Sequence, residues 1–195
     1  MKNITTYIVC FSILLMLMAC GSSPVPKPSG YMRIDLPEHQ YIQLDSIYPY
    51  SFEYPTYATI SSDEHAKNQP YWINIDFNKF KGRLHLSYKE IDNNLSTYAE
   101  DAHSLVMKHI PKASAINEIR LDNSANNVHG LIYDIQGSGA ASPYQFFATD
   151  STRHFLRGAL YFSVLPNNDS LQPVIDFVKK DIDHLLETLR WKEQE

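Results

Sequence analysis

The stretch YQFFATDSTRHFLRGALYF, residues 144–162, places two apolar segments on either side of a short polar one. Its centre, Asp-Ser-Thr at 150–152, consists of residues whose short side chains bond to nearby backbone N–H groups and so favour turns. Residues 144–149 and 155–164 are rich in the aromatic and branched side chains that pack well in sheets. The stretch therefore predicts a β-hairpin whose tip is the polar cluster.

Pairing the two segments about the turn sets the register of this hairpin. Phe146 then faces Gly158, and Ala148 faces Leu156. Side chains of the outgoing strand alternate between the two sides of the sheet. One side carries His154, Leu156, Leu160, Phe162 and Val164, and the other carries Arg153, Phe155, Arg157, Ala159 and Tyr161. We expect the first set to face the core.

The same tip contains the residue types of a nucleophilic triad, in Asp150, Ser151 and His154. A triad needs the histidine between the nucleophile and the acid, with an oxyanion hole nearby. These residues are crowded into one short segment, which also lacks the G-x-S-x-G turn that presents a nucleophilic serine. A structural turn is therefore the preferred interpretation, and no catalytic residue is assigned.

A second hairpin is predicted over residues 71–77 and 83–88, where apolar and polar residues alternate with period two. Keeping its apolar residues on one face places Asp76 directly across from His85 on the other face. The apolar set is Tyr71, Ile73, Ile75, Phe77, Leu84, Leu86 and Tyr88.

Other segments also favour strands. Residues 48–60 contain aromatic residues interrupted by Pro49 and Pro55, as in an edge strand. Residues 115–121 and 128–135 complete the predicted strands.

Two segments follow helical spacing instead. The first runs from residue 95 to 110 after Asn93 and Asn94 as candidate caps, and it stops at Pro111. The second carries a continuous apolar stripe of Leu171, Val174, Ile175, Val178, Ile182, Leu185, Leu186 and Leu189. We expect Asp169 or Ser170 to cap this second helix, Pro173 to lie in its first turn, and its solvent face to carry Asp181, Asp183 and His184.

This order of elements, three strands, a helix, four strands and a helix, predicts an α+β domain. Its sheet would be mainly antiparallel and covered by two helices. The order and the opening strand are similar to the Mog1/PsbP-like sandwich.

The N-terminus reads as a lipoprotein signal peptide. Lys2 precedes a short apolar run, which ends in Leu-Met-Ala-Cys at 17–20 and matches the bacterial lipobox. Cleavage after Ala19 would leave Cys20 as a lipidated N-terminus that anchors the chain to a membrane. The alternative is an ordinary secreted protein in which Cys20 is a spare thiol. The only other cysteine, Cys10, lies in the segment to be removed, so no disulfide or cysteine metal site is expected.

The predicted organisation is a signal peptide at 1–19, a Pro/Ser-rich linker at 20–30 and a single α+β domain at 31–195. We expect this domain to face the periplasm, while the choice between inner and outer membrane stays open. A formal net charge of -5 argues against nucleic-acid binding. The eight histidines show no paired ligand spacing, so neither a metal nor a cofactor is expected. The glycine-rich segment 137–142 precedes a strand and is interpreted as a loop.

Long segments of the chain resemble the gliding-motility lipoprotein D family. They are GYMRIDLP, YSFEYPTYA, INIDFNKFKGRLHLSY, YQFFATDSTRHFLRGALYFSV, PNNDS and HLLETLRW, and together they span residues 30–191. The resemblance implies a lipoprotein of the bacterial gliding apparatus and of the linked type IX secretion system. It implies no catalytic residue, and Cys20 alone carries over as a functional position.

Two functions follow for the domain. The first is a structural or assembly component that is not an enzyme, acts through contacts with other gliding or secretion proteins, and is held at the membrane by Cys20. The second is a small periplasmic hydrolase or ligand-binding lipoprotein, which would need a pocket with convergent polar groups. The candidate interaction surface comprises Asp76, His85, Arg153, His154 and Arg157.

Overall fold

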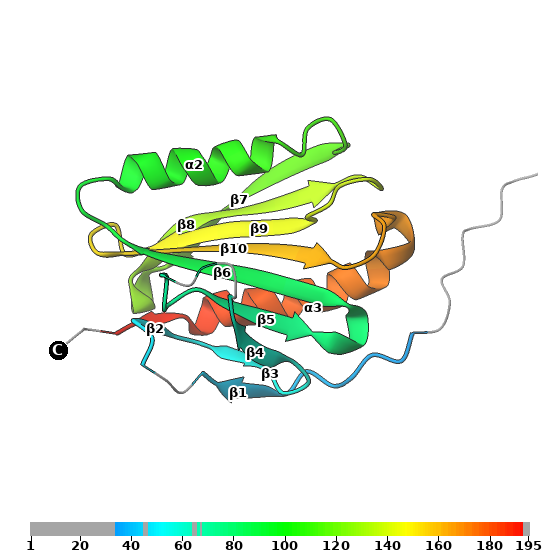
Figure 1. The fold of residues 1–195 in the computed structure, drawn as a ribbon, viewed down its shortest axis with the longest axis horizontal. Coiled ribbons are helices and arrows are strands. Elements are labelled where there is room, and N and C mark those ends of the chain that lie inside the picture. The colour runs from blue at the N-terminus through cyan, green and yellow to red at the C-terminus, as the bar shows by residue number, and fades with distance from the viewer. Residues whose placement is uncertain (1–33, 45–46, 64–65, 67, 193–195) are drawn as a thin grey trace, which may run out of the picture. The chain divides into compact units, whose positions relative to one another are not determined.

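The computed structural model describes residues 34–44, 47–63, 66 and 68–192. Its main sheet has seven strands in the order β4-β5-β6-β10-β9-β8-β7, and all neighbouring pairs are antiparallel. The strands are β4 (Thr59–Ser62), β5 (Ile73–Phe77), β6 (Gly82–Glu90), β7 (Ala115–Asn123), β8 (Val128–Gln136), β9 (Tyr144–Thr149) and β10 (His154–Phe162). Figure 1 shows this sheet with helices α2 and α3. The expected α+β fold with a mainly antiparallel sheet is confirmed.

The β9–β10 hairpin lies in the middle of this sheet, and its register is the one expected. Phe146 pairs with Gly158, and Ala148 pairs with Leu156. The ring of Phe146 covers Gly158 so closely that a Cβ atom there would lie 2.2 Å from Phe146 Cε1. Glycine is therefore required at position 158 by packing, since any side chain would collide with the ring.

The expected register of the β5–β6 hairpin is wrong by two residues. Asp76 lies opposite Arg83, and His85 lies opposite Asn74. The cause is the connection: a 3-10 turn at Asn78–Phe80 is followed by Lys81 with φ 53°, so the strands close where Phe77 meets Gly82. A shift of two residues preserves the faces. The apolar set accordingly packs into one core, as expected.

Residues 48–60 form three short strands rather than one. These are β2 (Tyr50–Ser51), β3 (Glu53–Pro55) and β4, of which only β4 joins the main sheet. β3 pairs with β1 (Tyr41–Gln43), and β2 pairs with β11 (Arg190–Trp191). Because proline cannot donate to a ladder, Pro49 and Pro55 limit how far the segment continues in one sheet.

Two helices in the described part of the chain cover opposite faces of the sheet. On one face, α2 (Leu95–Met107) packs Ala102 and Val106 against Phe147 and Phe155. On the other, α3 (Asn168–Thr188) buries Val178, Ile182, Leu185 and neighbouring residues against the larger core, which contains Leu156 and Leu160. Both faces of β10 are therefore buried, not only the one expected to meet the core.

The start of α3 differs from the expectation. Its N-cap is Asn167, ahead of Asp169 and Ser170, so Pro173 lies in the second turn instead of the first. The helix begins early because the buried side-chain amide of Asn168 donates to the carbonyls of Gly137 and Ala140, each at 2.9 Å. The same contacts hold the glycine-rich loop in place.

The predicted signal peptide at 1–19, the lipidated Cys20, the linker at 20–30 and the start of the domain near Tyr31 lie outside the described residues. Within the described ranges, no helix has both the length and the apolar character needed to cross a membrane.

Candidate functional site

The polar tip of the β9–β10 hairpin is a turn held by one carboxylate. Asp150 Oδ1 accepts hydrogen bonds from the backbone N–H groups of Thr152, Arg153 and His154 at 3.0, 2.8 and 2.8 Å. Burial alone would raise the pKa of Asp150, but these hydrogen bonds outweigh it and leave the pKa below its ordinary value. Ser151 takes a positive φ of 68°, as a tight turn requires. The hairpin-tip prediction is confirmed.

His154 points away from the tip and into the larger core. Its side chain is 5% exposed, its Nδ1 lies 2.7 Å from the hydroxyl of Tyr88, and its ring stacks on Trp191 with centroids 5.1 Å apart. Burial, the largest influence, lowers the pKa of His154, and the nearby Asp150 partly opposes this. The lowered pKa favours a neutral imidazole, whose tautomer sets which group donates in the contact with Tyr88. Asp150 and His154 are both occupied by structural contacts.

The structure does not bring the five candidate surface residues together. Asp76, His85 and Arg157 share the face of β5, β6 and β10 that α2 partly covers. Arg153 is exposed at the hairpin tip, and His154 is buried on the other face. Whether any of them contacts a partner stays a prediction.

On that shared face, Asp76 and His85 belong to separate clusters. The Asp76 carboxylate accepts from Arg83 Nε at 2.5 Å and from Ser61 Oγ at 2.6 Å. The ring of His85 meets Tyr161 edge-on, with centroids 5.7 Å apart. Burial and the nearby Arg83 lower the pKa of His85.

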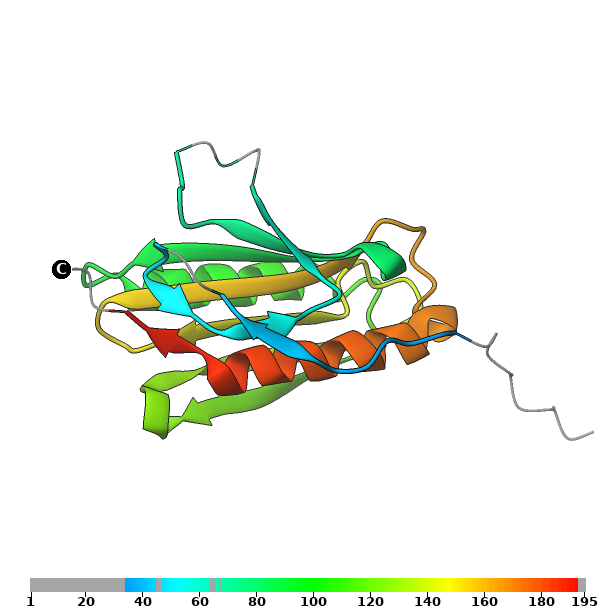
Figure 2. The same ribbon diagram turned by 90° about the horizontal axis from the view of Figure 1, so that it is seen from below.

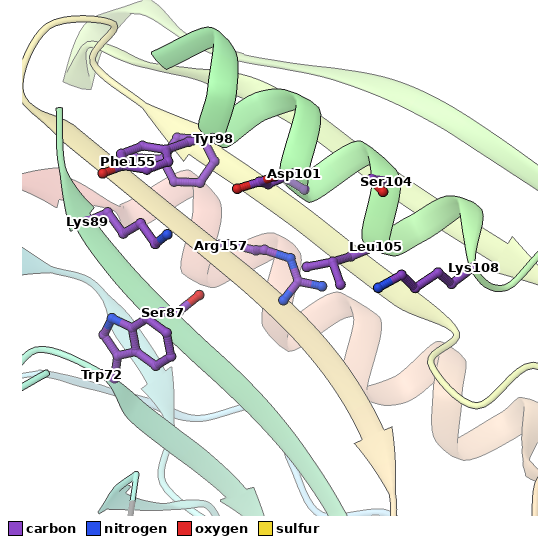
Figure 3. Close-up of a pocket in the computed structure, with 11 residues that line it drawn as sticks. Trp72, Ser87, Lys89, Tyr98, Asp101, Ser104, Leu105, Lys108, Phe155 and Arg157 are labelled. Carbon is purple, nitrogen blue, oxygen red and sulfur yellow. The ribbon is translucent and has the colours of Figure 1, made fainter. Parts of the chain in front are cut away.

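A groove runs between α2 and strands β6 and β10, and Figure 3 shows the side chains that line it. Its volume is about 440 Å³. Trp72, Tyr98, Leu105 and Phe155 supply apolar surface, and Arg157 lies at the floor. The groove exists because α2 covers β9 and part of β10 but leaves β6 open. It is the candidate functional site of the described domain.

Arg157 is held in the groove by a short chain of polar contacts. Its Nη2 donates to Gln145 Oε1 at 2.6 Å, and Gln145 Nε2 lies 3.0 Å from Nε2 of His109. Because the Gln145 oxygen is already occupied by Arg157, its amide nitrogen must donate, and His109 accepts as a neutral ring. Burial and the charge of Arg157 both lower the pKa of His109, which favours that neutral form.

The charge of the groove is mainly positive. Besides Arg157, its lining includes Lys89 and Lys108, whereas Asp101 is its one acidic residue. Lys89 Nζ lies over the ring of Tyr98, 4.5 Å from the centroid. Burial, the largest influence, lowers the pKa of Arg157, and the nearby Tyr161 partly opposes this. A guanidinium remains charged at neutral pH even so.

The sequence prediction missed the groove although it named Arg157. Only the fold brings its lining together, since Trp72 precedes β5, Lys89 lies in β6, and Tyr98 and Lys108 lie in and just after α2. The sequence did contain one signal for this site. On β6 and β10, the side chains that face away from the larger core include charged ones.

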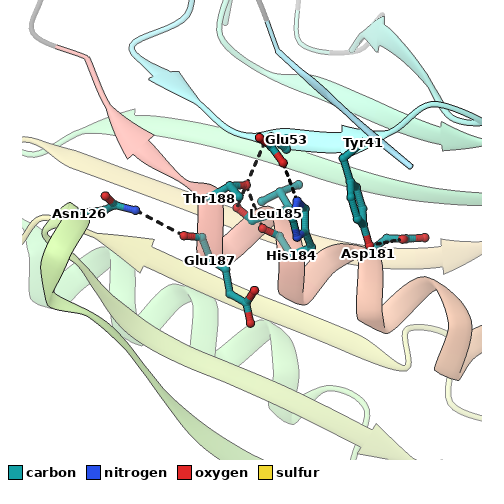
Figure 4. A network of polar contacts seen from close by, with 8 residues as sticks. All are labelled: Tyr41, Glu53, Asn126, Asp181, His184, Leu185, Glu187 and Thr188. Atoms are coloured by element: carbon teal, nitrogen blue, oxygen red, sulfur yellow. Dashed lines mark hydrogen bonds and ion pairs between the residues drawn. The ribbon is translucent and has the colours of Figure 1, made fainter. Parts of the chain in front are cut away.

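A second polar network lies on α3, and Figure 4 shows part of it. Asp181 is 1% exposed and accepts hydrogen bonds from Tyr41 at 3.0 Å and from Tyr57. His184 Nε2 lies 2.7 Å from Glu53 Oε2, and Asp183 accepts from Tyr144. The expectation that the three α3 residues face solvent is wrong: Asp181 is buried, and Asp183 and His184 are half-buried. Segments preceding β5 pack over Asp181 and His184, whereas Asp183 meets Tyr144 of β9. Figure 2 shows residues 34–43 lying along α3.

Among the residues that the structure describes, no three His, Asp, Glu or Cys side chains gather as metal ligands would. The groove residues likewise supply ammonium and guanidinium groups, which repel cations.

Comparison with known proteins gives the fold and the family. The solution structure of cyanobacterial PsbP (CyanoP) from Synechocystis sp. PCC 6803 is similar, with a TM-score of 0.50 and 14% sequence identity over 85% of this chain and 99% of that chain. This likeness supports the PsbP-like sandwich and, at such low identity, the fold alone. No curated protein matches the chain. A family model described as gliding motility lipoprotein GldD matches residues 21–191. The chain therefore belongs to the gliding motility lipoprotein GldD family.

Proposed function

We propose that the chain is a lipid-anchored structural or assembly component of the gliding apparatus and of the linked type IX secretion system. In this proposal it acts through contacts with other proteins of that machinery. The match of a gliding motility lipoprotein family model to residues 21–191 is the observation that carries it. The lipobox ending at Cys20 supplies the anchor, and the domain faces the periplasm.

In this proposal the domain is not an enzyme. The residue types that would form a nucleophilic site are engaged elsewhere: Asp150 caps a turn, and His154 bonds to Tyr88. A base that is buried and hydrogen-bonded to a tyrosine is poorly placed to activate the exposed Ser151. These contacts support a domain that works by binding.

A ligand-binding lipoprotein is the second candidate, and the groove beside α2 favours it. A concave site with apolar walls and a few convergent polar groups is the usual form of a ligand pocket. A binding role for the groove is compatible with the assembly role, because a lipoprotein can use one surface for a ligand and another for a partner.

The proposal is tested by purifying the tagged lipoprotein from detergent-solubilised membranes and identifying what accompanies it. Gliding or type IX secretion proteins should copurify with the wild type. The Cys20→Ala variant should lose labelling by radioactive palmitate, accumulate as an uncleaved or soluble species and fail to restore gliding. Repeated purification of the wild type alone would contradict the assembly role, and continued palmitate labelling of the variant would contradict the anchor.

A further inference from the structure

The groove beside α2 has at its floor a cation that forms no ion pair with an acidic side chain of the described residues. None of the ion pairs formed by the described residues includes Arg157, whose neutral neighbours Gln145 and Tyr161 contribute its favourable contacts. Arg157 is half-buried, so part of its charge is removed from water. A desolvated charge is costly unless it is paired, and arginines in such positions usually have a carboxylate or phosphate partner. A guanidinium has five N–H donors, and Gln145 Oε1 takes one of them. Most donors of Arg157 therefore have no protein acceptor.

The groove is open beside that cation. In Figure 3, the Arg157 side chain extends between β6 and α2, beside Leu105 and Lys108. The Gln145 contact holds one edge of the guanidinium, so the group is oriented before any ligand arrives. A fixed guanidinium presents paired parallel N–H groups, which match the two oxygens of a carboxylate.

The walls indicate what accompanies the anion. Trp72 is held by a 2.7 Å hydrogen bond from its Nε1 to the carbonyl of Tyr88, and the ring of Tyr98 lies on the opposite, helical side. Leu105, 38% exposed, adds an aliphatic surface. From Tyr98 to Lys108 the helix extends about 15 Å, at 1.5 Å per residue. That length accommodates an aromatic ring with a short acidic arm, or a dipeptide.

The charge of the groove selects against a cation and favours an anion. Lys89 and Lys108 add two positive charges near the floor, and Asp101 subtracts one. The helix lines the groove from Tyr98 in its first turn to Lys108 just after its end, so the anion-binding groups are the side chains of Arg157 and Lys108.

We propose that this groove binds a ligand in which a carboxylate is joined to an apolar, planar body. Arg157 holds the carboxylate, Lys108 assists at the rim, and the body lies between Trp72 and Tyr98. Gln145 and His109 act as positioning residues through Arg157. This inference does not depend on the assembly role, since it concerns a site in the domain that can be occupied or empty in either case.

The test is calorimetric titration of the full-length lipoprotein in detergent micelles with 3-phenylpropanoate and, as the uncharged control, 3-phenylpropanamide. A charge-assisted pair contributes about 1.5 to 3 kcal/mol, so the amide should bind at least about tenfold more weakly. Arg157→Gln should cause a similar loss for the acid. Arg120→Gln, which removes an exposed arginine of β7 far from the groove lining, should bind the acid as the wild type does.

The carboxylate could belong to a peptide C-terminus or to a free small molecule. Titration with N-acetyl-glycyl-phenylalanine and with its C-terminal amide distinguishes these two sources. Tighter binding of the free-acid peptide than of 3-phenylpropanoate identifies a peptide C-terminus, and the reverse identifies a free small carboxylate. Both results support the site. If Arg157→Gln does not fold, as judged by circular dichroism, the exposed Lys108→Glu decides instead, with an expected loss of severalfold. Equal affinity for acid and amide, unchanged binding in these variants, or no binding of either acid would overturn the proposal.

Discussion

His39 Nδ1 lies 2.6 Å from Asp181 Oδ1, which joins two residues 142 positions apart. Asp181 is buried in α3, and Tyr41 and Tyr57 also donate to it. The ring of His39 stacks on Phe177 with centroids 4.2 Å apart. Residues 39–41, near the start of the described domain, are therefore fastened to α3 by a buried carboxylate.

Replacing Asp181 should strongly destabilise the domain. Asp181→Ala removes the acceptor of the half-buried Tyr41 and Tyr57 hydroxyls and the partner of His39, and each lost hydrogen bond costs about 1 kcal/mol. We expect a loss of about 3 kcal/mol or more in the free energy of urea-induced unfolding, followed by circular dichroism. The matched control is Asp176→Asn, an exposed carboxylate on the same helix, which should change stability by less than about 0.5 kcal/mol. Equal effects of the two substitutions would show that the network does not stabilise the fold.

The carboxylate of Asp150 should stabilise the hairpin turn. Asp150→Ala removes the acceptor of three backbone N–H groups and of the Thr152 hydroxyl, at about 1 kcal/mol each. We expect a loss of about 4 kcal/mol in the same unfolding experiment. Ser151→Gly at the neighbouring position should be neutral or slightly stabilising, because glycine tolerates the φ of 68°.

The contribution of Asp150 to the stability of the domain should decrease as the pH falls. Its folded-state pKa lies below the ordinary value of 3.8, so the unfolded state takes up a proton first as the pH falls. The stabilisation is complete above the unfolded-state pKa and is lost as the pH falls through the folded-state pKa. The difference between wild type and Asp150→Asn should therefore shrink in acid. A difference that grows on acidification would contradict the turn-capping role.

The alternation of apolar and polar residues was enough to predict which face of the sheet each side chain occupies. It was not enough to predict the register of both hairpins. The β9–β10 hairpin was predictable because its polar residues occupy a short turn between two apolar strands. The β5–β6 hairpin was not, because the 3-10 turn at Asn78–Phe80 and the left-handed Lys81 displace the pairing by two residues. A shift of two leaves every side chain on its original face, so the hydrophobic pattern cannot distinguish the two registers.

The candidate site could not be predicted from the sequence, because the tertiary fold brings its residues together. Arg157 could be assigned to a polar face from the alternation of β10, but its groove exists because α2 stops short of β6. Asp181 had a sequence signal that the prediction overlooked. It lies three residues after Val178 and seven after Val174, within the apolar stripe of α3. Its hydrogen-bond partners Tyr41 and Tyr57 come from distant segments and could not be inferred from helical spacing.

The buried His154 should make the domain less stable below neutral pH. Its pKa is lowered from the ordinary 6.5, chiefly by burial, so the unfolded state binds a proton more readily. Stability is unaffected by this group above about pH 6.5 and falls as the pH drops from there through the lower folded-state pKa. His154→Gln should reduce the slope of unfolding free energy between about pH 7 and pH 5. His85 and His109, whose pKa values are also lowered by burial, should account for part of the slope that remains.

The same variant provides its own control at higher pH. Losing the Tyr88 hydrogen bond and the Trp191 stacking lowers the unfolding free energy of the variant relative to the wild type by an amount that is constant above about pH 7.5. The titration effect is the additional change below that pH. An unchanged slope in His154→Gln would mean that the imidazole is protonated as easily in the folded domain as in the unfolded chain.

The contact between Phe146 and Gly158 leads to a final prediction about packing at the centre of the sheet. A Cβ atom at position 158 would lie 2.2 and 2.3 Å from Cε1 and Cζ of the Phe146 ring, which is itself 1% exposed. The ring has no free space to enter, so Gly158→Ala should destabilise the domain by about 1 to 3 kcal/mol, the usual cost of overpacking. Gly139→Ala is the matched control, because its nearest neighbour would be the flexible Lys112 side chain at 3.6 Å, and it should cost less than about 0.5 kcal/mol.

Phe146→Leu should recover part of the loss when it is combined with Gly158→Ala, since the smaller side chain makes room for the new methyl group. Urea unfolding of the four variants and the wild type gives the coupling between positions 146 and 158. Additive effects of the two substitutions would show that the ring does not cover the glycine in the folded protein.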